Sequence, residues 1–182
     1  MKGVAANIFM RILKGFFITA FLFLFFEARV CKGNSAIIFQ SAKRISRTEV
    51  YAALSRQDTV AIDKVLESLG DDTSASTMAY TGVLLMRKSA LKKFPIEKLN
   101  LFKEGRMRLQ EAFNKDSSNS EFRFLRLIIQ ENCPRFLNYY ENINKDAEAI
   151  KLNYKDFPQE LKKAVTDYSK TSKALKPEDL SY

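Results

Sequence analysis

The sequence predicts an all-α fold, built from antiparallel helix pairs in a small bundle or solenoid and preceded by an N-terminal apolar segment. Apolar residues recur at every third or fourth position over most of the chain, which places them on one face of a helix. The 182 residues also include 15 Phe and 7 Tyr but only 6 Gly and 4 Pro. This balance favours long helices over a turn-rich sheet protein.

Length and hydrophobicity set the number of domains. A chain of 182 residues that is 46% hydrophobic can bury one proper core but is too short for two. We therefore divide the sequence into an N-terminal segment over residues 1–36, a helical domain over residues 37–175 and a polar tail over residues 176–182.

The formal net charge of +9 does not indicate a nucleic-acid binder. Residues 1–31 hold four basic residues and one acidic residue of the 30 and 21 in the chain, so the remainder carries 26 basic and 20 acidic residues. These charges are interspersed, and no run of five like charges occurs. We expect a mixed, solvated surface and no nucleic-acid partner.

The N-terminal segment has the pattern of an export signal. Lys2, Arg11 and Lys14 precede an apolar run over residues 15–26, and such a run is typical of a secretory signal peptide, because a membrane span needs about 20 residues. We expect a periplasmic or secreted protein. An uncleaved anchor that holds the protein to the membrane through residues 15–26 stays open, since a helix could extend back past Lys14 if that side chain snorkels.

The two cysteines leave several possibilities open. Cys31 follows the apolar run, where a bacterial lipoprotein carries its acylated cysteine, but Arg29 and Val30 depart from that motif. A bridge between Cys31 and Cys133 is permitted only if residue 31 remains in the mature protein. Cys133 has no histidine to activate it, because the chain contains none.

The helical elements are expected in the following order. Two short helices lie within residues 46–70, the first begun by a capping box of Ser46 and Glu49, the second capped by Asp58 or Thr59 and ended by a left-handed Gly70. A helix starting near Ser76 or Thr77 runs to a break at Phe94, and Pro95 opens the next. Further helices are expected over residues 121–132, around 143–154, and from Pro158 to about 175.

One polar stripe interrupts the otherwise apolar helix over residues 121–132. Arg123, Arg126 and Gln130 are spaced at i, i+3 and i+7, so they share one side of that helix. This stripe is our candidate partner-binding surface, on which two guanidinium groups could hold a partner's carboxylate. Alternatively, both arginines pair with acids of the same chain, such as Glu104 or Glu141.

The centre of the chain resembles a tetratricopeptide repeat. The resemblance covers residues 78–129 and is carried by Gly82, by Gly105, Leu109 and Ala112, and by the polar turn over residues 114–121. The sequence departs from the repeat at Ser117, which replaces the usual proline, and shows no second copy. As a whole the chain is also similar to small exported bacterial helical proteins. The resemblance implies stacked helix pairs that bind a protein or peptide.

The absence of histidine removes the commonest general base and the commonest metal ligand. We therefore expect no enzymatic activity, no cofactor and no metal site. The sequence predicts an exported, non-enzymatic helical module that binds a protein or peptide. A membrane-surface protein that meets anionic lipid is the alternative.

Overall fold

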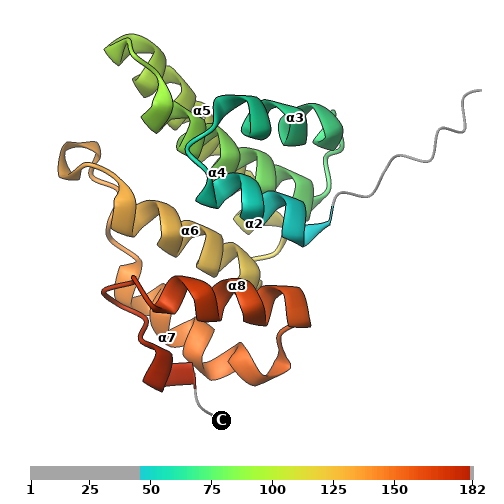
Figure 1. Cartoon of the computed structure of the whole chain (residues 1–182), viewed down its shortest axis with the longest axis vertical. Helices are drawn as coiled ribbons and strands as arrows, with labels where there is room; N and C mark the ends of the chain where they lie inside the picture. Colours follow the sequence, from blue (N-terminus) through green and yellow to red (C-terminus); the bar gives the residue numbers. More distant parts are fainter. Residues whose placement is uncertain (1–45, 181–182) are drawn as a thin grey trace, which may run out of the picture. The chain divides into compact units, whose positions relative to one another are not determined.

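The computed structural model describes residues 46–180, and within this range the protein is helical with no strand. The α-helices are α2 (Arg47–Ser55), α3 (Thr59–Leu69), α4 (Ala75–Leu91), α5 (Pro95–Lys115), α6 (Ser120–Asn132), α7 (Ile143–Asn153) and α8 (Gln159–Ser169), joined by the 3-10 turns η2 (Arg135–Leu137), η3 (Tyr154–Asp156) and η4 (Pro177–Leu180) (Figure 1). The all-α prediction is confirmed. The N-terminal apolar segment and Cys31 lie outside the described residues.

The helix ends follow from local side-chain chemistry. The capping box of Ser46 and Glu49 is present at the start of α2, and Asp58 caps α3 through the backbone N–H of Val60. Helix α4 begins slightly before the predicted start, because the Ser74 hydroxyl accepts a hydrogen bond from the Thr77 backbone. Gly70 ends α3 with φ 57° and ψ −150°, a conformation outside the predicted left-handed region but also one that glycine adopts most readily.

Helices α4 and α5 form an antiparallel pair whose backbones touch. A Cβ atom added to Gly82 would lie 2.7 Å from the carbonyl oxygen of Gly105 and 2.7 Å from the backbone nitrogen of Leu109. A Cβ atom added to Gly105 would in turn meet the carbonyl oxygen of Gly82. Since real Cβ contacts are not this short, the pair requires glycine at both positions.

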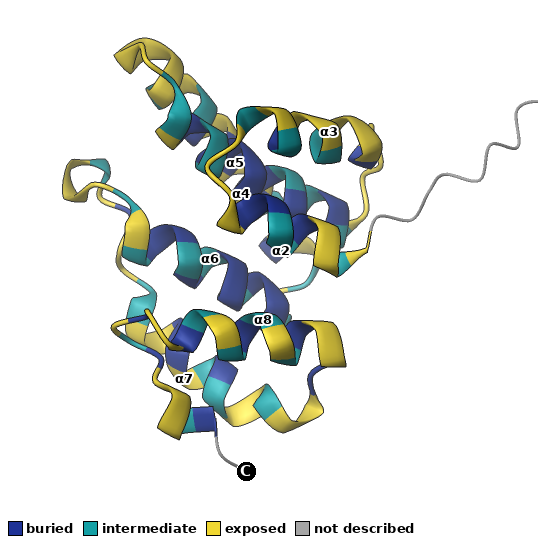
Figure 2. Cartoon of the chain, in the orientation of Figure 1, coloured by how far each residue is buried: buried dark blue, intermediate teal, exposed yellow. Residues whose placement is uncertain are grey.

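Helix α6 lies between two hydrophobic clusters and contributes to both (Figure 2). Phe122, Leu125 and Ile129 pack with α2 to α5, whereas Phe124 and Leu127 pack with α7, α8 and the C-terminal segment. All five side chains are buried. The helix is therefore enclosed over most of its circumference, as its sequence of apolar residues predicts.

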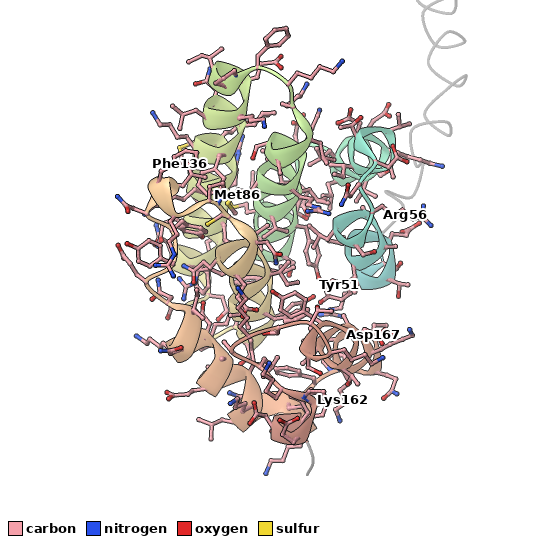
Figure 3. All side chains as sticks on the ribbon, turned by 60° about the vertical axis from the view of Figure 1, so that its left-hand side comes forward. Tyr51, Arg56, Met86, Phe136, Lys162 and Asp167 are labelled. Carbon is pink, nitrogen blue, oxygen red and sulfur yellow. The ribbon has the colours of Figure 1, made fainter. Side chains whose placement is uncertain are left out.

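Helices α2 and α8 cover the same side of α6. The Phe124 ring makes edge contacts with Tyr51 of α2 at 6.0 Å and with Tyr168 of α8 at 5.8 Å, and Figure 3 shows Tyr51 on the side of the α2 ribbon that faces α8. The Tyr51 hydroxyl also donates to the buried carboxylate of Glu121, and so do Tyr80 and Arg47. This network ties α2, α4 and α6 together.

The C-terminal segment is more ordered than a polar tail. Residues 177–180 form η4, in which Leu180 is buried and Asp179 pairs with Lys151 at 2.7 Å. The segment is fixed by Glu131 of α6, which accepts hydrogen bonds from the side chains of Ser172 and Tyr168 and from two backbone amides. Within the predicted polar tail over residues 176–182, residues 177–180 therefore form a short 3-10 turn that packs on the rest of the protein.

We predict that Gly82→Ala lowers the free energy of unfolding by about 3 kcal/mol, because the new methyl group has to push the α4 and α5 backbones apart. Denaturant titration measures the change. Gly70→Ala is the matched control: nothing lies within 4 Å of its added Cβ, and only the positive φ opposes it, so about 1 kcal/mol is expected. Equal stabilities of Gly82→Ala and the parent would contradict the close backbone contact.

A second prediction concerns pH. Burial of the Glu131 carboxyl opposes ionisation, but the hydrogen bonds from Ser172, Tyr168 and the backbone outweigh it and hold the pKa below its ordinary value of 4.5. A lowered folded-state pKa stabilises the protein above pH 4.5, and this stability is lost as the pH falls through the folded pKa. Glu131→Gln should therefore be less stable at pH 7 and lose less stability between pH 7 and pH 3.

The pH effect is measured by denaturant titration at both pH values, with Glu160→Gln at an exposed position of α8 as the control. The control should follow the parent protein. If Glu131→Gln matches the parent at pH 7, the carboxylate does not fix the C-terminal segment.

Candidate functional site

A polar cleft lies between α5, α6 and the connector that follows α6 (residues 133–142). Its volume is about 120 Å³, several times the roughly 30 Å³ that one water molecule occupies in the liquid. The lining residues are Arg106, Leu109, Gln110 and Phe113 of α5, Arg126 and Gln130 of α6, and Asn138, Tyr139, Glu141 and Asn142 of the connector. Two of the three residues in the predicted stripe, Arg126 and Gln130, therefore contribute to one cleft.

Gln130 is the unusual residue of this cleft. Its side chain is buried, with 3% exposed, yet neither Nε2 nor Oε1 has a hydrogen-bond partner in the part of the chain that the structure describes. Buried polar side chains are normally paired, so an unpaired one needs an explanation. A missing ligand group with both a donor and an acceptor would satisfy this amide.

Arg126 is held in place from two sides. Its Nε and Nη2 atoms donate to the two carboxylate oxygens of Asp146 of α7, each at 2.7 Å, and its guanidinium carbon lies 4.1 Å from the centroid of the Phe113 ring. Because these contacts fix the guanidinium plane, Arg126 presents a pre-oriented cation to the cleft.

Arg123 lies outside the lining of the cleft. It pairs with the same Asp146 at 3.4 Å and donates to the carbonyl oxygen of Ser117 at 3.0 Å. Both arginines of the stripe are thus bound to a carboxylate of the same chain, as our alternative interpretation held, but the acid is Asp146 and neither Glu104 nor Glu141.

Arg106 is a cleft residue that the sequence did not reveal. Its guanidinium carbon lies 4.9 Å from the centroid of the Tyr139 ring. Burial raises the pKa of Tyr139 to about 12, so this ring stays neutral and offers its face to the cation. The only signal in the sequence was an aromatic-rich connector, which gives no indication of which α5 residue it contacts.

The connector is fixed at both the backbone and the side-chain level. The Cys133 thiol donates to the carbonyl oxygen of Tyr139 at 3.3 Å, and the Tyr139 ring packs edge-on against Phe102 of α5 at 5.7 Å. Asn138 takes a left-handed conformation with φ 47°, which turns the chain back toward α6. These contacts hold the third wall of the cleft in position.

The groups that line the cleft are mostly polar and charged. Two guanidinium groups, the carboxylate of Glu141 and several carboxamides line it, and burial raises the pKa of the neighbouring Cys133 thiol, which keeps it protonated. No group of His, Cys, Asp or Glu side chains within residues 46–180 could hold a metal ion. Among the same residues, no helix is both long and apolar enough to span a membrane.

Comparisons with protein-family models, curated proteins and solved structures give no match to this chain. Within residues 46–180, the features that characterise the protein are therefore its all-helical fold and the polar cleft between α5, α6 and the connector.

We predict that Gln130→Met raises the free energy of unfolding by about 1 kcal/mol, because a side chain of similar shape replaces two unpaired polar atoms. Chemical denaturation measures the change. Gln159→Met, at an exposed position of α8, provides the matched control and should have little effect. A loss of stability at Gln130→Met alone would mean that the amide is paired in the folded protein.

Proposed function

We propose that this protein is a non-enzymatic helical interaction module, exported to the periplasm or secreted, that binds a protein or peptide partner in the cleft. The observation that carries the proposal is the buried Gln130 amide, which has no hydrogen-bond partner among residues 46–180. A binding protein can keep such a group because the ligand supplies the missing hydrogen bonds. The predicted partner-binding residues Arg126 and Gln130 belong to this cleft, and Arg123 supports it through Asp146.

The size of the cleft favours a macromolecular partner. Sites for small molecules and cofactors usually have volumes of about 300–1,000 Å³, whereas this cleft has about 120 Å³. It can hold one side chain or one chain terminus, with the rest of the partner lying outside. We therefore favour a protein or peptide over a free metabolite.

The resemblance to tetratricopeptide repeats supports an interaction role but suggests another binding face. The pairs α4–α5 and α6–α7 would correspond to successive helix pairs, and such proteins bind partners along the surface of their stacked helices. Here α2 and α8 cover the side of α6 that bears Phe124. We therefore propose that the partner binds in the cleft, which is lined by Arg126 and Gln130 of α6.

Attachment to a membrane remains the second candidate, because the run over residues 15–26 could act as an uncleaved anchor. N-terminal sequencing of the mature protein distinguishes the two. A chain that still begins at Met1 is anchored, and a chain that begins beyond Ala28 has been released.

We predict that a photocrosslinking amino acid in place of Gln110, at the exposed rim of the cleft, captures a discrete partner when the full chain is irradiated in the cells that produce it. The same amino acid in place of Lys163, on the exposed side of α8, is the control and should capture none. Adducts are measured by gel shift and mass spectrometry.

The test is decided by whether the crosslinked adduct depends on the cleft. Adding Gln130→Met to the Gln110 variant should abolish the adduct, whereas adding Gln159→Met should leave it. An adduct of equal yield with Gln130→Met, or the same adduct from position 163, would exclude the cleft as the binding site.

A further inference from the structure

We infer that the group bound in the cleft is a peptide carboxylate, held between Arg106 and Arg126. This inference rests on the proposed function and specifies its ligand. It assigns to Arg106, a residue outside the predicted stripe, the ionic contact with the partner.

The cleft has cationic donors that its own chain leaves unused. Arg106 contacts the Tyr139 ring but pairs with no carboxylate among residues 46–180. Arg126 gives Nε and Nη2 to Asp146, which leaves its Nη1 without an acceptor in the same range. Two guanidinium groups with free N–H donors at one small cleft form a natural site for an oxygen anion.

Both cations are held before the ligand arrives. Arg126 is clamped by Asp146 and Phe113, and Arg106 rests on a tyrosine ring that is itself buried. Ordering a long, flexible side chain on binding normally costs conformational entropy. Because these contacts have already restricted the two side chains, that cost is reduced and the ionic contacts contribute more fully to affinity.

The acidic groups limit the charge of the ligand. Glu141 lines the cleft and Asp146 lies directly behind Arg126, so the two arginines face two carboxylates of their own chain. A phosphate group, which carries close to two negative charges, would be repelled more strongly than a singly charged carboxylate. The charge balance therefore favours the carboxylate.

The Gln130 amide indicates which other group of the ligand binds beside the carboxylate. Its amide offers a donor and an acceptor just beneath the lining of the cleft. A peptide carries both an acceptor oxygen in its carboxylate and a backbone N–H close by, so it can complete both hydrogen bonds of the amide. Because both amide atoms are buried, a side chain that lines the cleft has to move before the ligand reaches them.

The test uses three capped peptides and the full chain. Ac-Ala-Ala-Ala-OH carries a terminal carboxylate, Ac-Ala-Glu-Ala-NH₂ carries a side-chain carboxylate, and Ac-Ala-Ala-Ala-NH₂ carries none. Binding is followed by NMR through the side-chain amide signal of Gln130. We expect at least one acidic peptide to bind ten times more tightly than the neutral one. Which acidic peptide binds identifies the source of the carboxylate.

Matched variants locate the contact. Arg106→Gln should weaken the acidic peptide about tenfold without affecting the neutral one, whereas Arg108→Gln, on the same helix but outside the cleft, should leave binding unchanged. Equal binding of acidic and neutral peptides, an unaltered affinity in Arg106→Gln, or displacement by inorganic phosphate at equal concentration would overturn the inference.

The proposed function can survive such a result. If no acidic peptide binds but crosslinking from position 110 still depends on Gln130, the cleft binds its partner through other chemistry and only the carboxylate is excluded. If both the peptides and the crosslink fail, the proposed function and the inference fail together.

Discussion

The enclosure of α6 is the constraint on which the rest of the structure depends. Its apolar residues belong to both hydrophobic clusters, so nearly every side of this helix faces other protein atoms. Polar side chains on such a helix must find partners inside the chain, since water is excluded. Glu121 does so through Tyr51, Tyr80 and Arg47, and the same hydrogen-bonded network fixes α2 against α4 and α6.

Gln130, which lines the cleft, is the exception to this rule. The structure buries two polar side chains of α6, Glu121 with 6% exposed and Gln130 with 3% exposed. The first accepts hydrogen bonds from three residues, and the second has none. Burial also raises the pKa of Tyr51 and Tyr80, with a further contribution from the Glu121 charge, so those phenols remain donors. One polar group of α6 therefore serves the fold, while the other is unpaired among residues 46–180, and we propose that a ligand pairs with it.

Local patterns predicted the elements well, because their causes lie within a few residues. The spacing of apolar side chains indicated the helices, and Ser46, Asp58 and Pro95 marked three of their starts. The polar stripe on α6 was equally local. Its partners were not, because Asp146 follows Arg126 by 20 positions and Arg106 precedes it by 20. The sequence alone could not indicate which of the many acids would meet the arginines.

The C-terminal segment and Gln130 show two different reasons why part of the structure could not be predicted from the sequence. Leu175 and Leu180 stand in a polar stretch without helical periodicity, so their burial follows only from the anchor at Glu131 on α6. Gln130, in contrast, was predicted as part of the polar stripe, but nothing in the sequence indicated that its amide would be buried and unpaired among residues 46–180. An apolar residue there would complete the buried surface of α6, and folding therefore gives no reason for a carboxamide. We propose that a partner's donor and acceptor complete the site, since function is a common reason for a locally unfavourable residue.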